Sequence, residues 1–594
     1  MNATDLLLLP VAVPLLAAAI VAGVGRLLPR ILLDAVVLVV ALGVASLGAL
    51  LLVATRRHDV ATVAGGWGAV HGHPVGIDVV ADPMTAGLIC LDGLVLAIAL
   101  AYTWHYFDDV DAVLHGLLLA FVGGLAGFAL AGDLFTLFVM LELVSVIGFV
   151  LTGYRIEAER SLQGALAFAV ASTIGGVLTL TGIALVYART GQLALASIGR
   201  SLAEQPADGL VAASFALVLA GFLVKAATVP FHFWTAGAEM VAPTPVCILF
   251  SALLVTSGVY AVGRIYHVAY QQALPGADVR PVLLAFGAAS ALVGALMSLG
   301  QRHFKRMLAF STIAHSGILL VGVGLLNRDG AAGAVTYAVG HAGAKGALFC
   351  VGGVLLSRFK SVDENDLHGR GRRLAATGVA AALGALALAG APPFGTGLGK
   401  ALTEDAADSA GEQWLVPVLV LASGLTGAAV LRFTIRCFLG WGRPVDSGGV
   451  PGRRGEEPEP DPAGRLLVSA WLLLGLSLLA GLAGTGWAAH VGSSYVDSGA
   501  YTRALWGGPA PPAVAMHLTG WHATGLPLAF APALLACAIA ALWLLPGIGT
   551  ATRAVTLSVL RPLRAMHTGR LGDETTWLLA GTGAFGIAML LLRA

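Results

Sequence analysis

The sequence is poor in charged side chains, and poorest in lysine. Only 11% of its 594 residues are charged, whereas a water-soluble chain carries about 25%. So few charges exclude a soluble globular protein, and a hydrophobic content of 57% excludes disorder. The formal net charge of +1 gives no electrostatic reason to expect a nucleic acid or an acidic partner.

Cysteine is also scarce, and its spacing excludes several kinds of site. The five cysteines stand singly, without CxxC or CxH spacing, so we expect no iron–sulfur cluster, zinc site or disulfide framework. The sequence also lacks a Walker motif, GxSxG and HExxH. We therefore expect no metal and no cofactor, and any oxidoreductase activity would belong to a complex of which the chain is a subunit.

Long apolar runs, in contrast, recur along the whole chain. A membrane-spanning helix needs about 20 residues of this kind. The runs predict an all-α polytopic membrane protein with about 16 transmembrane helices. We place them near residues 6–28, 32–55, 84–104, 113–131, 134–153, 162–188, 210–230, 245–266, 281–300, 306–326, 332–356, 374–391 (running on to about 408), 414–440, 466–485, 524–545 and 575–592.

The basic residues gather in alternate loops, which predicts the orientation. With the N-terminus outside, most arginines and lysines fall in inside loops, as expected in a cell membrane. An even number of spans then places both termini outside. Residues 441–465 are rich in proline, glycine and charge and predict a flexible inside linker.

The layout of the spans predicts five segments. Residues 113–266 and 281–440 each hold five spans, one of them interrupted by proline, and we interpret them as two repeats. The segments are N-terminal helices with an outside loop at 56–83 (1–112), a first five-helix repeat (113–266), a second five-helix repeat (281–440), the linker (441–465) and C-terminal helices (466–594).

Ionisable residues at membrane depth are the candidate functional residues, because each costs roughly 2.5–3.5 kcal/mol at the centre of a span. Glu142 lies near the middle of one span, and Lys225 lies in a span that Pro230 interrupts. The proline removes a backbone donor, so the freed backbone groups can line a wet cavity. This pattern favours proton exchange over the alternatives, a packing carboxylate and a lysine that reaches the membrane surface.

The second repeat carries a similar set of residues. His341 and Lys345 are four residues apart, so they lie on one helical face and can share a proton. Lys400 follows a second interruption at Pro392 and Pro393. Paired interruptions of this kind are typical of transport sites in repeated folds.

Six segments, in order and spacing, resemble the antiporter-like subunit family. This family contains the large membrane subunits of respiratory complex I, of Mrp-type Na⁺/H⁺ antiporters and of membrane-bound hydrogenases. The resemblance covers residues 76–440. The segments are GDLFTLFVMLELVSVIGF, LVKAATVPFHFW, APTPV with LVTSGVY, KRMLAFSTIAHSG, HAGAKGALF and AGAPPFGTGLGK.

The resemblance implies a 14-helix core with two inverted five-helix repeats and two discontinuous helices. It implies that Glu142 and Lys225 form the pair of the first half-channel. His341 and Lys345 would be the central relay, and Lys400 the terminal lysine. In the family these residues form a polar axis at the bilayer midplane that couples proton movement to a redox or ion-exchange step.

The sequence departs from the family at several positions. Thr256 stands where many members carry a lysine, and Ser251 stands close to a histidine of the distal complex I subunit. Glu239 stands where several members have a neutral residue or a histidine. Together with Asp133 and His315, these are candidate relay residues, although His315 is equally consistent with an interior histidine that has no such role.

The resemblance favours a proton-translocating subunit of a multi-subunit membrane complex of the NADH-quinone oxidoreductase type or a related redox-driven pump. Its partners would be other membrane subunits, protons and the lipid bilayer. Two alternatives stay open. One is an Mrp-type subunit that exchanges Na⁺ or K⁺ for H⁺, and the other is a membrane scaffold that docks a soluble enzyme, as in inorganic-carbon uptake complexes of this family.

Overall fold

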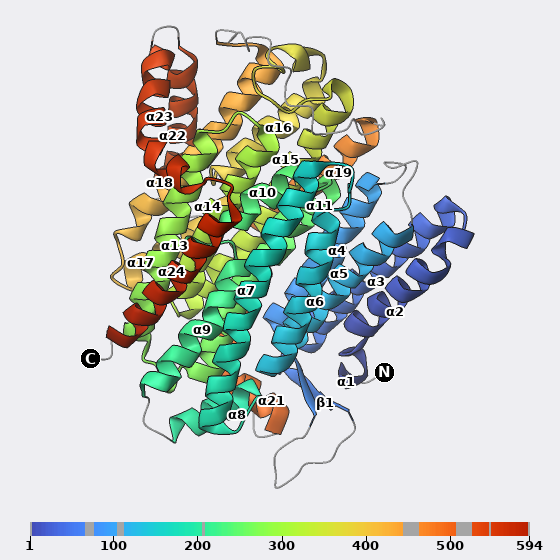
Figure 1. Ribbon diagram of the computed structural model, residues 1–594, viewed down its shortest axis with the longest axis vertical. Coiled ribbons are helices and arrows are strands. Elements are labelled where there is room, and N and C mark those ends of the chain that lie inside the picture. Colours follow the sequence, from blue (N-terminus) through green and yellow to red (C-terminus); the bar gives the residue numbers. More distant parts are fainter. Residues whose placement is uncertain are drawn as a thin grey trace.

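The computed structural model describes residues 3–65, 76–103, 112–204, 208–442, 463–506, 526–545 and 548–591. The described chain is almost entirely helical, and most of its helices lie side by side (Figure 1). The predicted linker falls mainly on residues 443–462, which lie outside the described residues. The boundaries predicted for the segments and repeats stay predictions.

The first part of the chain contains the sheet and the helices up to the first proline break. The elements are α1 (Ala3–Leu6), α2 (Leu9–Val24), η1 (Gly25–Leu27), α3 (Arg30–Ala54), β1 (Val60–Ala64), β2 (Ile77–Ala81), α4 (Pro83–Thr103), α5 (Ala112–Leu130), α6 (Leu134–Thr152), α7 (Glu159–Thr190), α8 (Leu195–Ala203) and α9 (Gly209–Lys225).

The middle part runs from the first break to Leu439, and two of its spans contain π-helical turns, at Phe250–Leu254, Tyr266–Tyr270 and Ile435–Leu439. The elements are α10 (Phe233–Val241), α11 (Thr244–Leu249), η2 (Phe250–Leu254), α12 (Val255–Ile265), η3 (Tyr266–Tyr270), α13 (Gly276–Leu299), α14 (Phe304–Gly324), α15 (Arg328–Phe359), η4 (Arg370–Arg373), α16 (Ala375–Leu388), α17 (Gly395–Ser409), α18 (Leu415–Thr434) and η5 (Ile435–Leu439).

The last part of the chain is a set of helices that pack against helices of the first and middle parts. The elements are α19 (Ala463–Leu482), α20 (Gly486–Val496), α21 (Ser498–Trp506), α22 (Leu526–Leu544), α23 (Ile548–Met566) and α24 (Leu571–Leu591). Helix α19 packs against α15, and α24 packs against α9. The tail of the chain therefore covers helices from both of the predicted repeats.

The fold is the predicted all-α membrane architecture. Twelve helices of the described chain are long and apolar enough to cross a membrane, or 13 with the pair Leu466–Leu482 and Gly486–Val496, which bends by 83°. The remaining predicted spans correspond to three shorter apolar helices, at Gly209–Lys225, Ala375–Leu388 and Ala529–Leu544. The first two of these end at the proline breaks.

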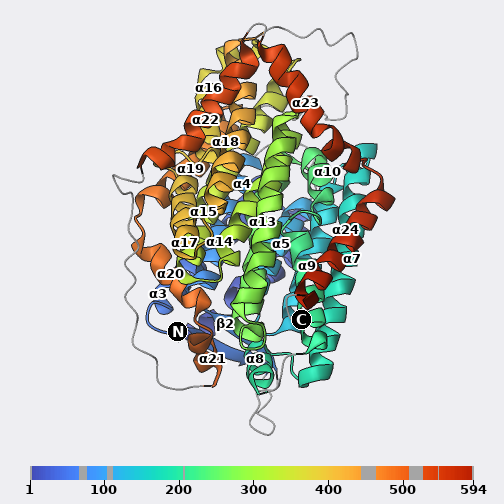
Figure 2. The same cartoon turned by 90° about the vertical axis from the view of Figure 1, so that its left-hand side faces the viewer.

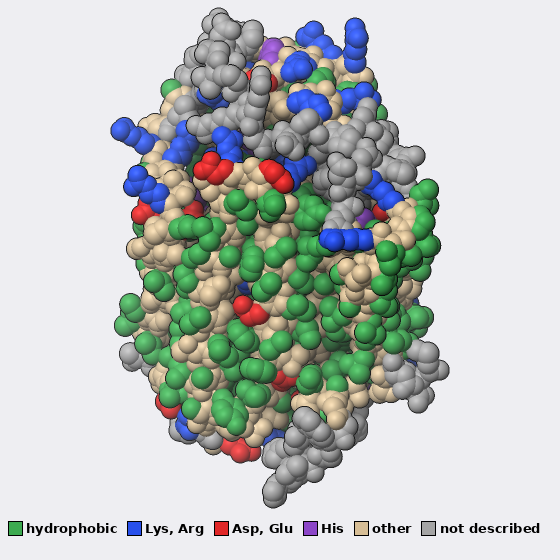
Figure 3. Space-filling view, turned by 45° about the vertical axis from the view of Figure 1, so that its right-hand side comes forward, with side chains coloured by type: hydrophobic (Ala, Val, Ile, Leu, Met, Phe, Trp, Pro, Cys, Tyr) green, Lys and Arg blue, Asp and Glu red, His purple; other side chains and the backbone are tan. Residues whose placement is uncertain are grey.

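The surface and the interior both suit a bilayer. Figure 3 shows a broad apolar band on one face, with lysine and arginine gathered near the upper end. Inside, glycine lets helices approach closely. At Gly294 of α13 a Cβ atom would collide with the backbone of Ala314 in α14, so these two helices are in backbone contact.

The β-hairpin and both termini lie toward the same end of the molecule. Strands β1 and β2 are antiparallel, with Val60 opposite Ala81. The end of α5 joins this sheet through a bridge between Val79 and Ala131. Figures 1 and 2 both place the N- and C-termini in the half of the molecule that carries the hairpin and α8.

Candidate functional site

The first break begins directly after Lys225, where α9 ends. Pro230 cannot donate a backbone hydrogen bond, so the helix cannot continue in register. Neighbouring side chains satisfy the groups that are freed. Trp234 Nε1 donates to the carbonyl of Val224 at 2.8 Å, and Ser290 Oγ accepts from the amide of Val229 at 2.8 Å.

Lys225 is buried at this break without a hydrogen-bond partner for its Nζ atom in the described chain. The nearest aromatic surface is the ring of Phe168 on α7, whose centroid is 5.5 Å from Nζ. Glu142 on α6 interacts electrostatically with Lys225, yet the described residues form no direct ion pair between them. The structure thus brings the two predicted partners together as an open pair.

The carboxylate of Glu142 occupies space that a glycine leaves on a third helix. A Cβ atom at Gly176 of α7 would lie 2.6 Å from Oε1 of Glu142, so the glycine makes room for the carboxylate. Oε1 has no hydrogen-bond partner among the described residues. A carboxylate that is neither paired nor fully hydrogen-bonded responds strongly to the position of a nearby cation.

Glu239 is fully buried, interacts electrostatically with Lys345 and begins a short chain of polar side chains. Its Oε2 accepts from Thr312 Oγ1 at 2.9 Å, and Thr312 Oγ1 lies 3.0 Å from Ser251 Oγ. Thr256 instead donates to the carbonyl of Ala252 in its own helix. Of the candidate relay hydroxyls, Ser251 therefore joins the polar chain, and Thr256 bonds only within its own span.

Lys345, the predicted central lysine, is fully buried and hydrogen-bonded to a neighbouring helix. Its Nζ donates to Ser311 Oγ at 2.6 Å and to the carbonyl of Leu308, both on α14. It also interacts electrostatically with Glu239. Glu239, which stands where several family members have no carboxylate, therefore lies near Lys345. Hydroxyl groups of α14 bind both side chains.

His315 and His341 form a stacked aromatic column next to Lys345. The two imidazole centroids are 5.1 Å apart, and Tyr337 continues the stack, with its hydroxyl 2.5 Å from Nδ1 of His315. Neither ring nitrogen of His341 has a hydrogen-bond partner among the described residues. The column therefore holds two buried imidazoles, and in the described chain some of their ring nitrogens have no hydrogen-bond partner.

The second break separates α16 from α17 at residues 389–394. Lys400 follows it by little more than one turn of α17, and its side chain is fully buried. Its Nζ donates to both carboxylate oxygens of Glu404, at 2.9 and 3.0 Å. Lys400 therefore sits in a closed ion pair, unlike Lys225.

Asp133 has a local structural role. Its Oδ1 accepts from the amide of Thr136 at 2.7 Å and caps the N-terminus of α6. In the described structure its electrostatic neighbour is Asp78 of β2. Asp133 thus belongs to the end of α6, about two and a half turns from Glu142 along the helix.

Several residues of the site escaped the sequence analysis. Glu404 had a signal, because it stands four residues after Lys400 on the same helical face. Ser311, Thr312 and Tyr337 had none, since single hydroxyl groups are common in membrane helices and their partners lie on other helices. Only the packing of α14 against α10 and α15 shows their positions.

Comparison with known proteins identifies the family of the chain. A profile described as NADH:quinone oxidoreductase/Mrp antiporter, TM matches residues 131–426, which contain the breaks and every axis residue described above. NADH-quinone oxidoreductase subunit N from Desulforudis audaxviator is 30% identical over 454 residues, which are 75% of this chain and 88% of the relative. The chain belongs to the NADH:quinone oxidoreductase/Mrp antiporter family.

Two further comparisons extend the likeness of this family member beyond the profile. A Na⁺/H⁺ antiporter subunit from Bacillus subtilis is 27% identical over 513 residues, which are 84% of this chain and 97% of the relative. A chain in the structure of the Mrp complex from Dietzia sp. DQ12-45-1b superimposes with a TM-score of 0.76 at 25% identity, covering 86% of this chain and 100% of that chain. The chain is thus similar along most of its length to subunits of multi-subunit membrane complexes.

Proposed function

We propose that this chain is a proton-translocating, antiporter-like subunit of a multi-subunit membrane complex. The observation that carries the proposal is the buried Nζ of Lys225, which lies at a helix break, lacks a hydrogen-bond partner in the described chain and interacts with Glu142 on a different helix. Burying an unpaired cation in a membrane is costly, and such residues mark ion and proton paths.

The proposed mechanism is a charge switch. When α6 and α9 approach, the carboxylate of Glu142 stabilises the protonated form of Lys225. When they separate, the stabilisation is lost and Lys225 releases its proton toward the interior. The polar chain of Ser251, Thr312 and Glu239 and the central Lys345 would receive it.

From the centre, the proton would pass to the second half. The column of His315, Tyr337 and His341 lies beside Lys345, and its members Tyr337 and His341 stand on α15, which packs against α17. Lys400 and Glu404 would form the terminal site. We place the chain in the cell membrane with both termini outside, a topology supported by the basic residues gathered at the opposite end of the molecule (Figure 3).

A second candidate is the Mrp-type exchange of Na⁺ or K⁺ for H⁺. It is favoured by the likeness to the Na⁺/H⁺ antiporter protein of Bacillus subtilis and to the Mrp complex of Dietzia. The axis described above serves either function, since both need a proton path. The two functions differ in the ion whose gradient the complex changes.

The test uses the intact complex in inverted membrane vesicles. Lys225→Ala and Glu142→Ala should each abolish ion-gradient formation while the complex still assembles. Arg160→Ala and Glu157→Ala change exposed charges on the same part of the chain and should transport normally. Full transport by both axis variants would refute the proposal. Parallel measurements of internal pH and of Na⁺ or K⁺ uptake separate the redox-driven pump from the exchanger.

A further inference from the structure

The tail of the chain lies directly on the first break. Helix α24 packs against α9, and at Gly581 a Cβ atom would collide with the ring of Pro230. Leu560 and Leu563 of α23 belong to the same apolar cluster as Val229, in the break, and Ala236, in α10 after it. Two helices from the end of the sequence therefore hold the interrupted span in place.

A pair of histidines joins this tail to the break. Nε2 of His232, in the break, lies 2.8 Å from Nε2 of His567, in the turn between α23 and α24. The ring of His567 also lies against Phe233 and Phe310, with centroids 4.9 and 5.5 Å away. His232 is buried, whereas His567 is half-buried and is followed by an exposed turn.

The hydrogen bonds assign the protons of this pair. Nδ1 of His567 lies 2.7 Å from the carbonyl of Leu563, and a carbonyl only accepts, so Nδ1 donates. The Nε2 atom of neutral His567 then accepts from Nε2–H of His232. Nδ1 of His232 is left as a buried acceptor without a partner in the described chain.

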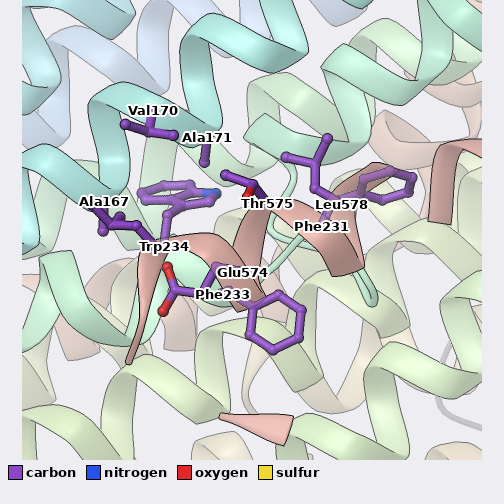
Figure 4. A pocket seen from close by; sticks show the side chains of 10 residues that line it. Ala167, Val170, Ala171, Phe231, Phe233, Trp234, Glu574, Thr575 and Leu578 are labelled. Carbon is purple, nitrogen blue, oxygen red and sulfur yellow. The ribbon is translucent and has the colours of Figure 1, made fainter. Parts of the chain in front are cut away.

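The break leads from this histidine pair to Lys225. Trp234, two residues after His232, donates to the carbonyl of Val224 and stacks on Phe168 at a centroid distance of 4.1 Å. Phe168 is the ring beneath Nζ of Lys225. A small pocket opens beside Trp234, and Glu574 of α24 lines it together with Phe233 (Figure 4).

We propose that His567 and His232 form a proton relay between the exposed turn of the tail and the first half-channel. One proton passes in three moves. An N–H bond forms at Nδ1 of His232, and the proton between the two Nε2 atoms moves to His567. The N–H bond at Nδ1 of His567 then breaks as this nitrogen turns from the carbonyl of Leu563 to water at the exposed turn, which accepts the proton. Passage in the opposite direction reverses these moves, and rotation of the rings resets the pair.

The charges around the relay suit transient protonation. Arg306 of α14 interacts electrostatically with His567, and burial together with this cation lowers the pKa of His567. Two other charged residues nearby are hydrogen-bonded elsewhere. Arg564 donates to the carbonyl of Gly300, and Asp573 accepts a hydrogen bond from Thr568. Glu574 is the carboxylate that faces the break. A proton that reaches the pair is therefore passed on rather than retained.

The experiment measures proton transport by the intact complex in inverted vesicles. The relay rests on the proposed function, so Lys225→Ala is the reference for a blocked axis. His567→Gln keeps hydrogen-bonding groups but cannot carry a proton through its side chain. We expect His567→Gln and His232→Gln to lower the rate roughly a hundredfold, the effect of removing a positioned proton-transfer group. His490→Gln changes an exposed histidine of α20 and should not lower it.

Chemical rescue distinguishes transfer from packing. His567→Ala with added imidazole should recover transport in proportion to the imidazole concentration, while the complex stays assembled on native gels. Normal transport by His567→Gln would overturn the relay. Loss of transport that imidazole does not restore would also overturn it and assign the pair a structural role. If Lys225→Ala transported normally, the proposed function would fail, whatever the histidine variants did.

Discussion

The two proline breaks each have a buried lysine beside them, but the two lysines are held in different ways. In the first, Lys225 ends the helix before the break, and its partner Glu142 stands on another helix, with no direct ion pair between them in the described chain. In the second, Lys400 follows the break and is bound to Glu404 on its own helix at 2.9 Å.

This difference decides which half can respond to movement. Residues four apart on one helix stay neighbours when the helix moves as a body. A pair on two helices changes its separation whenever the helices shift. Movement of α6 against α9 therefore alters the electrostatic environment of Lys225, whereas rigid movement of α17 leaves the pair of Lys400 intact. The first half suits a switch and the second half suits a terminal site.

The largest expected effect tests this contrast through stability. Lys400→Met leaves Glu404 buried without its cation, and breaking a buried pair in this way costs about 3–5 kcal/mol. Lys225→Met removes a cation that has no hydrogen-bond partner among the described residues, so it should leave stability unchanged or raise it. Thermal unfolding of the purified complex in detergent measures both.

The double variant supplies the control for this prediction. Lys400→Met with Glu404→Gln removes both charges, and much of the lost stability should return, although transport should not. If Lys225→Met proved as destabilising as Lys400→Met, the two lysines would be held alike and the contrast between the halves would be wrong.

The next effect concerns the acidic end of α6, where the first half meets the β-hairpin. Burial, and then the nearby charge of Asp133, raise the pKa of Asp78 from 3.8 to about 7. The folded chain thus holds this proton more tightly than the unfolded chain does. The stability that Asp78 contributes is complete below about pH 4 and is lost as the pH rises through 7.

Asp78→Asn should remove this pH dependence. The melting temperature of the variant should exceed that of the unmodified complex at pH 8 and approach it at pH 5. The difference between the two pH values corresponds to about 2–3 kcal/mol, from the size of the shift. Both melting temperatures are compared between pH 5 and pH 8. If that of the wild-type complex fell no further than that of Asp78→Asn, the raised pKa of Asp78 would be wrong.

Much of the fold was predictable because the bilayer imposes it. Apolar runs of fixed length predict spans, and Pro230 and Pro393 predict where two of them break. The pairing within the first half was predicted only through resemblance to the family, since Glu142 and Lys225 stand on separate helices. Whether such a pair is open or closed depends on the packing of α6, α7 and α9, which no local pattern encodes.

The tail contact shows the same limit more sharply. His232 and His567 are 335 residues apart in the sequence, and a lone histidine carries no signal of its partner. Glu404 is the opposite case: it was not among the predicted residues, but its spacing of four from Lys400 places both side chains on one helical face and was visible in the sequence. Contacts within one helix were accessible from sequence, and contacts between distant helices required the structure.

The smallest expected effect compares how the two breaks are covered. Gly581 of α24 lies against Pro230, and Gly481 of α19 lies against the carbonyl of Pro393, each without room for a Cβ atom. Gly581→Ala and Gly481→Ala must push a helix away from its break, an overpacking that costs about 1–3 kcal/mol. Gly583→Ala and Gly475→Ala place the same methyl group on the same helices in open space and should be neutral.

Transport separates the two breaks further. Displacing α24 also moves the turn that carries His567, so Gly581→Ala should lower the transport rate by more than its loss of stability accounts for. Displacing α19 leaves Lys400 and Glu404 on one helix, so Gly481→Ala should lower the melting temperature with a smaller loss of transport. If Gly581→Ala and Gly481→Ala lost transport equally, both breaks would depend on their covering helix in the same way. The difference between the two halves would then lie only in the pairs Glu142–Lys225 and Lys400–Glu404.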